Sequence, residues 1–189
     1  FRLSPDGTRL AYKVDRGNDA FVVLDGAEGK AYDGVWELVF SPDSRKLAYV
    51  AWREGKWLTV LNTEEGPQFD QAWAPTFSPD GKRLACVARR GEKQLVVVDA
   101  KPGVEYDRIG EGTVRFSADG KRAGYAAHRG KKHRIVIDGR EGPAYDWIGP
   151  EGPVFSPDGR SVAYRAGRAR QQFVVVDGGR ELLELLQGN

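Results

Sequence analysis

Apolar residues along this chain fall in short runs that are separated by polar turns, and many of the runs are rich in valine and isoleucine. Three of the runs end in an acidic residue, at Val22–Asp25, Val96–Asp99 and Ile135–Asp138. Continuous apolar runs of this length are typical of strands that are covered on both faces. The pattern predicts strands along the whole chain and no helix before the C-terminus, where Glu181–Gln187 fits either an outer strand or a short amphipathic helix.

One polar turn recurs five times and sets the period of the chain. It reads Ser-Pro-Asp-Gly with small variations, and its five serines lie 37, 37, 39 and 39 residues apart. In such a turn proline fixes φ, aspartate accepts hydrogen bonds from nearby amides, and glycine adopts a positive φ. The five turns are Ser4–Gly7, Ser41–Ser44, Ser78–Gly81, Ser117–Gly120 and Ser156–Gly159.

Each period contains four short strand segments, which is the composition of one β-propeller blade. A small residue in the middle of the second strand lets neighbouring twisted sheets pack closely. These residues are Ala11, Ala48, Ala85, Gly124 and Ala163. We therefore predict an all-β fold, a single β-propeller domain over residues 1–189 that is built from five four-stranded antiparallel blades. The predicted blades cover approximately residues 1–35, 36–72, 73–110, 111–149 and 150–189.

Closure of the propeller is a question separate from the structure of the blade. The chain begins inside a repeat, so only Phe1–Leu3 remain of the innermost strand of the first blade, and no C-terminal strand obviously replaces it. Either the five blades close alone, in which case we expect a monomer, or they form part of a larger propeller or of an oligomer.

The segment Phe77–Ala85 reads Phe-Ser-Pro-Asp-Gly-Lys-Arg-Leu-Ala and resembles the blade signature of TolB-like, WD-repeat-like propellers. The resemblance covers all five repeats, although the chain lacks a repeated Trp-Asp dipeptide. It implies a bacterial periplasmic or extracellular domain, or the propeller of a prolyl-oligopeptidase-type peptidase. It implies no particular ligand, and the sequence itself leaves the compartment open.

Composition narrows the choice of partners. Twenty-nine basic and 27 acidic residues leave a net charge of +2, so the overall charge gives no reason to expect nucleic acid. No apolar stretch approaches the roughly 20 residues of a membrane span. The one cysteine, Cys86, cannot form an intrachain disulfide, and it replaces a tyrosine of the other repeats. We therefore expect Cys86 to be a small core residue.

The turns between the second and third strands differ most in charge, and function on a repeat scaffold is expected where the repeats differ. The fourth and fifth repeats are basic there, and the candidate ligand-binding residues are Arg129, Lys131, Lys132, Arg168 and Arg170. Such a sector would bind an anionic partner, for example an acidic protein segment. Basic turns that serve only solubility are the alternative.

Tryptophans form a second candidate site because they are unevenly distributed. Trp36 and Trp73 hold the same position early in the innermost strand, where the later repeats carry Gly112 and Glu151, and Trp147 lies in the corresponding loop of the next repeat. Exposed aromatic residues at this place would bind a peptide or a sugar. Tryptophans that wedge between blades are the alternative.

Candidate catalytic groups are few. Five of the seven serines belong to the recurring turns, and no Gly-x-Ser-x-Gly nucleophile elbow is present. His128 and His133 flank a basic turn that would repel a metal ion. We expect no catalytic residue, no cofactor and no metal.

An aspartate that follows tyrosine or phenylalanine recurs in four repeats and has two interpretations. A ring of carboxylates could hold a cation, or each carboxylate could accept backbone N–H groups and tie one blade to the next. The four residues are Asp33, Asp70, Asp107 and Asp146.

These observations favour a noncatalytic propeller scaffold that binds a protein or peptide through its loop-bearing face. Two alternatives remain open at this stage. One is the regulatory propeller of a larger hydrolase or peptidase whose catalytic domain lies elsewhere, and the other is a structural repeat protein without a specific ligand.

Overall fold

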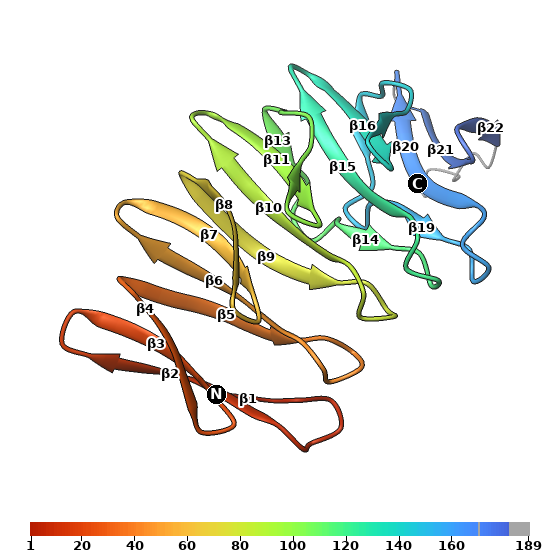
Figure 1. Cartoon of the computed structure of the whole chain (residues 1–189). Helices are drawn as coiled ribbons and strands as arrows, with labels where there is room; N and C mark the ends of the chain where they lie inside the picture. Colours follow the sequence, from red (N-terminus) through yellow and green to blue (C-terminus); the bar gives the residue numbers. More distant parts are fainter. Residues whose placement is uncertain (170, 182–189) are drawn as a thin grey trace, which may run out of the picture. The chain divides into compact units, whose positions relative to one another are not determined.

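The computed structural model describes residues 1–169 and 171–181 of the chain (Figure 1). These residues form five antiparallel sheets, and in each sheet the strands follow one another in sequence order. Each sheet has four strand positions, which confirms the predicted all-β fold of five four-stranded blades. Arg170 and the segment 182–187 lie outside the described residues, so the choice of strand or helix for that segment stays a prediction.

The first three sheets are built from unbroken strands. Sheet 1 contains β1 (Arg2–Leu3), β2 (Leu10–Arg16), β3 (Asp19–Leu24) and β4 (Ala27–Tyr32). Sheet 2 contains β5 (Gly34–Phe40), β6 (Leu47–Arg53), β7 (Lys56–Leu61) and β8 (Glu64–Phe69). Sheet 3 contains β9 (Gln71–Phe77), β10 (Leu84–Arg90), β11 (Lys93–Val98) and β12 (Lys101–Pro102).

The last two sheets have a first strand in two halves. Sheet 4 contains β13 (Arg108–Ile109) and β14 (Arg115–Phe116) as these halves, followed by β15 (Ala123–Arg129), β16 (Lys132–Ile137) and β17 (Arg140–Glu141). Sheet 5 contains β18 (Trp147–Ile148) and β19 (Val154–Phe155), followed by β20 (Val162–Arg168), β21 (Gln171–Val176) and β22 (Gly179–Glu181).

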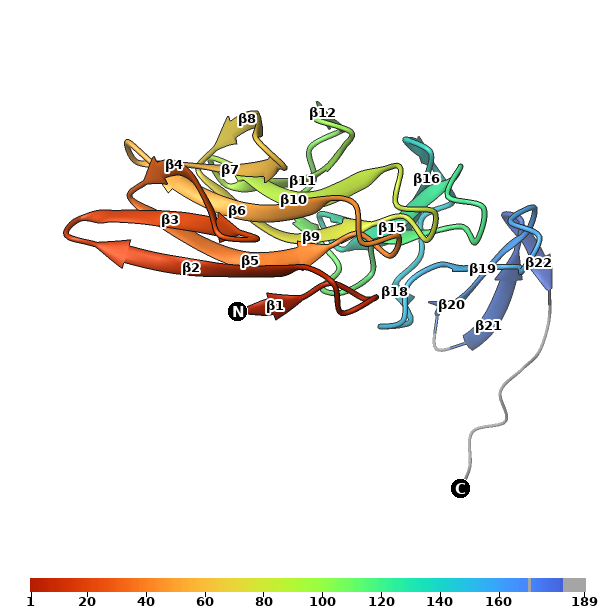
Figure 2. The same cartoon turned by 60° about the horizontal axis from the view of Figure 1, so that its bottom comes forward.

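The chain divides into two compact units. The first unit, Phe1–Gly103, holds sheets 1 to 3, and within it sheet 2 lies between sheets 1 and 3 (Figures 1 and 2). The second unit begins at Val104 and holds sheets 4 and 5, which contact each other through β16 and β18. Among the described residues no helix has the length and apolar character that a membrane crossing requires.

The recurring Ser-Pro-Asp-Gly turn is closed by side-chain hydrogen bonds. Ser4 Oγ donates to Asp6 Oδ1 at 2.6 Å and accepts the N–H of Arg9 at 3.0 Å. The other four serines donate in the same way to Asp43, Asp80, Asp119 and Asp158. Ser44 stands where the other turns have glycine, and its φ of 62° is the positive value that glycine favours there. The turn is therefore a structural device of every blade.

The aspartates that follow the outer strands bind backbone amides. Asp33 Oδ2 accepts the N–H of Glu54 at 2.7 Å, and Asp70 Oδ2 accepts the N–H of Gly91 at 2.7 Å. The equivalent pairs of the second unit are Asp107 with Gly130 at 2.6 Å and Asp146 with Ala169 at 2.9 Å. Each carboxylate thus holds the hairpin turn of the following sheet, which confirms the second of the two interpretations.

The 39-residue periods differ from the 37-residue periods in the first strand. In sheet 2, β5 continues past Trp36 through a bulge. In sheet 4, Gly110 occupies the register position of Trp36 and begins a tight turn that Thr113 closes through its N–H. The register therefore matches Trp36 and Trp73 with Gly110 and Gly149, so the sequence alignment with Gly112 and Glu151 was wrong. The extra residues of the longer repeats lie in this turn.

A pair of tyrosine rings joins neighbouring sheets. Tyr49 of β6 packs edge-on against Tyr32 at the end of β4, with ring centroids 6.1 Å apart. The pairs of the second unit are Tyr125 with Tyr106 at 6.3 Å and Tyr164 with Tyr145 at 6.0 Å. Tyr32 also donates its hydroxyl to Glu65 of β8 at 3.1 Å, as Tyr106 does to Glu141 at 2.9 Å. The junction between sheets thus combines apolar packing with a polar link.

Candidate functional site

Two tryptophans form an exposed aromatic surface on sheet 2. Trp36 of β5 is 42% exposed, and its ring lies 4.6 Å from the ring of Trp57 at an interplanar angle of 37°. Lys13 of β2 places its Nζ 5.8 Å from the Trp36 ring. We call Trp36, Trp57 and Lys13 the tryptophan surface. It lies beside the turn between β6 and β7, at one end of sheet 2.

Local backbone features position Trp36. Gly34 allows the indole to lie against the strand, because a Cβ on Gly34 would come within 2.2 Å of the Trp36 ring. Glu37 follows with a φ of 52°, and its carboxylate accepts the N–H of Ala74 at 2.8 Å. Ala74 also has a positive φ, 54°, at the matching place in sheet 3. Linked bulges in β5 and β9 therefore set the direction of the strand after each tryptophan.

The other two predicted tryptophans lie in different settings. Trp73 lies in β9 opposite Val87 and is partly buried. Trp147 begins β18 and lies beneath Arg165, whose guanidinium is 5.8 Å from the indole. The structure therefore groups Trp36 with Trp57, which sequence reasoning did not single out. The concentration of three tryptophans in one repeat, at 36, 52 and 57, was the available signal.

Two of the predicted basic residues occupy a position that recurs in every sheet. Arg129 lies 4.8 Å from the Tyr106 ring, and Arg168 lies 5.3 Å from the Tyr145 ring and donates to the carbonyl of Ala144 at 3.2 Å. Arginine ends the second strand in all five sheets, at Arg16, Arg53, Arg90, Arg129 and Arg168. Arg129 and Arg168 thus pack on the tyrosines that precede their own sheets in the chain, and comparison of the repeats in register could have revealed this from the sequence.

The remaining basic candidates differ in their surroundings. Lys132 pairs with Asp146, and this ammonium group is the first cause that holds the pKa of the Asp146 carboxyl below its usual range. Lys131 is exposed at the tip of the turn and has no ionic partner among the described residues. Arg170 lies outside the described residues. Within the second unit the structure therefore leaves Lys131 as the unpaired charge of the predicted sector.

Serine and histidine side chains are engaged in structural contacts. The five turn serines donate to aspartates, Ser44 accepts the N–H of Asp6 at 3.1 Å, and Ser161 donates to Asp177 at 2.8 Å. The rings of His128 and His133 lie 4.1 Å apart, and burial, followed by the charges of His133 and Arg108, lowers the pKa of His128. In the part of the chain that the structure describes, no three acidic, histidine or cysteine side chains are placed to hold a metal ion.

Comparison with known proteins bears on the fold. No protein-family model matches the chain, and no curated protein matches it. The β-propeller domain of the Trilobed protease from Pyrococcus furiosus, whose topology is called open velcro, is 15% identical with a TM-score of 0.51. The match covers 94% of this chain and 67% of that domain.

Two further solved structures are similar over most of the chain. A eukaryotic initiation factor is 16% identical with a TM-score of 0.56, and the match covers 93% of this chain and 49% of that one. TolB from Acinetobacter baumannii is 18% identical with a TM-score of 0.45, covering 92% of this chain and 50% of TolB. The chain thus spans about half the length of these two proteins. With the five sheets, the protease domain confirms a β-propeller fold, and at these identities the likeness concerns the fold alone.

Proposed function

We propose that this chain is a noncatalytic β-propeller domain that binds a peptide segment of a partner protein at the tryptophan surface of sheet 2. The observation that carries the proposal is the exposed Trp36, whose ring lies against the tilted ring of Trp57. Tryptophan is enriched at the centre of protein interfaces, where its large rigid surface binds at a small entropic cost. Two adjoining indole rings present a broader apolar area than a single ring.

The surroundings of the pair favour a partner with an acidic residue beside an apolar one. Lys13 lies over the Trp36 ring and also pairs with Asp15 at 2.9 Å, and both of these charges remain partly exposed. A carboxylate of the partner would compete with Asp15 for the ammonium group, while an apolar side chain covers the indole. Such a rim charge contributes more to specificity and association rate than to affinity.

The proposal that the domain is noncatalytic rests on the contacts of the serine hydroxyls and on the burial of the Cys86 thiol. The serine hydroxyls bind aspartates or backbone N–H groups of the blade, and the Cys86 thiol is buried with its pKa raised to about 11. A nucleophile requires an accessible side chain beside a general base. The described serines and Cys86 lack these surroundings.

The basic turns of the second unit are a separate surface for an acidic partner. Fewer residues support binding at this surface, because Arg129, Arg168 and Lys132 already make contacts within the blades. Binding of an acidic partner at these turns would therefore depend mainly on Lys131.

The test is selection of peptides from a random library on the purified chain, followed by affinity measurement with the selected peptides. Trp36→Ala should weaken their binding about 30-fold, which corresponds to loss of a central interface side chain. Trp147→Ala is a matched control from the second unit, and we expect it to leave the affinity unchanged. Equal affinity of the Trp36→Ala variant and the unsubstituted chain would refute the assignment, as would a library that yields no binding peptide.

A further inference from the structure

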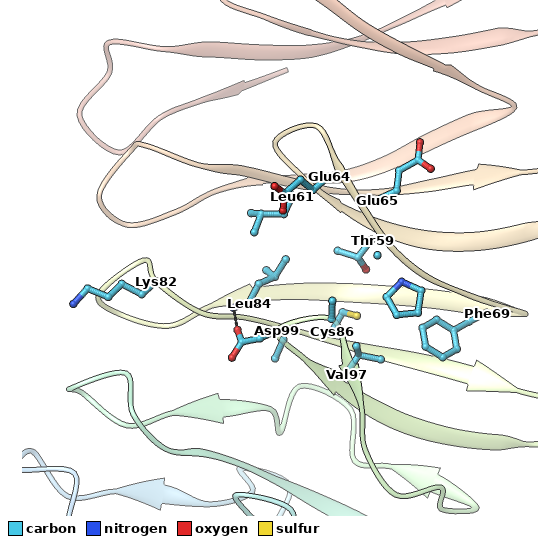
Figure 3. A pocket seen from close by; sticks show the side chains of 14 residues that line it. Thr59, Leu61, Glu64, Glu65, Phe69, Lys82, Leu84, Cys86, Val97 and Asp99 are labelled. Atoms are coloured by element: carbon cyan, nitrogen blue, oxygen red, sulfur yellow. Dashed lines mark hydrogen bonds between the residues drawn. The ribbon is translucent and has the colours of Figure 1, made fainter.

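A cavity of about 270 Å³ lies between sheets 2 and 3 of the first unit (Figure 3). Thr59 and Pro67 line it from sheet 2, and Leu84 and Cys86 line it from sheet 3. Phe69, at the end of β8, forms part of the wall beside the Cys86 side chain (Figure 3). Most of this lining is apolar.

The cavity lies at the junction where the tyrosine pair is replaced. Phe69 and Cys86 occupy the positions that Tyr32 and Tyr49 hold between sheets 1 and 2. Pro102 pairs with Val97 at the position that Glu65 holds in sheet 2, where the Glu65 carboxylate accepts a hydrogen bond from the Tyr32 hydroxyl. Three substitutions, at 69, 86 and 102, thus remove two phenol groups and their acceptor from one junction.

A fourth difference places an unpartnered hydroxyl at the same junction. The residue opposite the middle of the second strand is valine or isoleucine in the other sheets, at Val22, Val96, Ile135 and Val174. In sheet 2 it is Thr59, whose Oγ1 is buried and makes no hydrogen bond of normal geometry among the described residues. Its hydroxyl is close to the Cys86 thiol and partly offsets the effect of burial, which raises the pKa of that thiol. A buried hydroxyl without a partner costs stability, so its presence at this cavity calls for an explanation.

We propose that this cavity binds a small neutral phenol. The ring would pack edge-on against Phe69, as Tyr49 packs against Tyr32, and the phenol oxygen would bond to Thr59 Oγ1. An apolar cavity of about 150 Å³ is large enough for benzene, so about 270 Å³ accommodates a substituted phenol. Four charged side chains also line the cavity, namely the carboxylates of Glu64, Glu65 and Asp99 and the ammonium group of Lys82. The excess of carboxylates over this one cation disfavours an anion.

The corresponding groove of the second unit differs from this cavity in size and lining. Between sheets 4 and 5 it has a volume of about 730 Å³ and includes Tyr164, the tyrosine that Cys86 replaces. Charged side chains line it, among them Arg122, Arg140 and Arg160. That groove is larger and polar, whereas the one at Cys86 is smaller and largely apolar.

The experiment is titration of the full chain with p-cresol, which has the shape of a tyrosine side chain, followed by NMR of the methyl groups of leucine, valine and threonine. Saturable shifts should centre on Thr59, Leu84 and Val97. Cys86→Tyr should abolish them, because the protein's own phenol then fills the space, while Cys86→Ala should keep them. Thr59→Val should weaken the binding of p-cresol about 5-fold. It should not weaken the binding of p-xylene, which lacks the hydroxyl.

Outcomes that overturn the proposal are shifts that do not saturate, shifts away from the cavity, or binding that the Cys86→Tyr variant retains. If the Cys86→Tyr variant does not fold, the test is the binding of p-cresol and p-xylene to the Thr59→Val variant. An equal change in the affinity for both ligands overturns the proposal. N-acetyltyrosinamide identifies the source of the phenol. Binding comparable to p-cresol assigns a tyrosine of a peptide, and markedly weaker binding assigns a free small molecule.

Discussion

The link between sheets 1 and 2 offers a direct test of how neighbouring blades are held together. Tyr32 donates its hydroxyl to Glu65 at 3.1 Å, and the same carboxylate binds Arg53 at 2.8 Å and Lys30 at 3.3 Å. The Tyr32 hydroxyl is a donor at neutral pH, as in any tyrosine, and burial, the first cause that raises its pKa, keeps the proton in place at higher pH as well. We predict that Tyr32→Phe destabilises the chain because this hydroxyl is lost while the ring packing on Tyr49 is kept.

The expected magnitude follows from the surroundings of the carboxylate. A hydrogen bond to a charged group contributes about 1.5–3 kcal/mol when it is well buried. The Glu65 side chain is 21% exposed and keeps its two cationic partners, so we expect about 1 kcal/mol for Tyr32→Phe. For a chain of this size that loss corresponds to about 2–4 °C in Tm.

The assay is urea unfolding followed by tryptophan fluorescence, applied to a double-mutant cycle of Tyr32→Phe and Glu65→Gln. The cycle separates the pair from the other contacts of Glu65, and the coupling energy should be about 1 kcal/mol. Circular dichroism confirms that each variant keeps its strands. A coupling energy of zero in folded variants would show that packing alone joins these sheets and would refute the reasoning.

Two further predictions concern the second unit. Gly124→Ala should lower the free energy of unfolding in urea by about 1–3 kcal/mol, since a Cβ there would lie 2.5 Å from Ile137 Cδ1. Ile137→Val removes that methyl group and should relieve most of the loss. An equal loss from Gly124→Ala in the presence and absence of Ile137→Val would contradict the packing argument. The lowered pKa of His128 means that the unfolded chain binds its proton first, so stability should fall as pH drops below about 6.5. His128→Gln should flatten the dependence of the urea midpoint on pH between pH 7.5 and pH 5.5, and an unchanged slope would refute the assignment to His128.

The sequence by itself determined the blade. The recurring turn, the small residue in the second strand and the apolar runs each depend on contacts within one repeat, and such contacts leave the same residues at the same spacing. The aspartates at 33, 70, 107 and 146 illustrate the limit of this reasoning. Their spacing was visible, but only the bonds to the following hairpin turns decided between a cation ring and a structural tie.

The tertiary structure decided which differences between repeats belong together. The sequence presents Arg129 and Arg168 as a basic patch, yet each lies over the ring of the tyrosine that precedes its own sheet in the chain. Thr59 and Cys86 are 27 positions apart and look unrelated, and only the packing of sheet 2 on sheet 3 brings them to one cavity. The periodicity of the sequence reflects the packing requirements of single strands. A site is formed by side chains of different sheets, and these side chains come together only through the packing of those sheets.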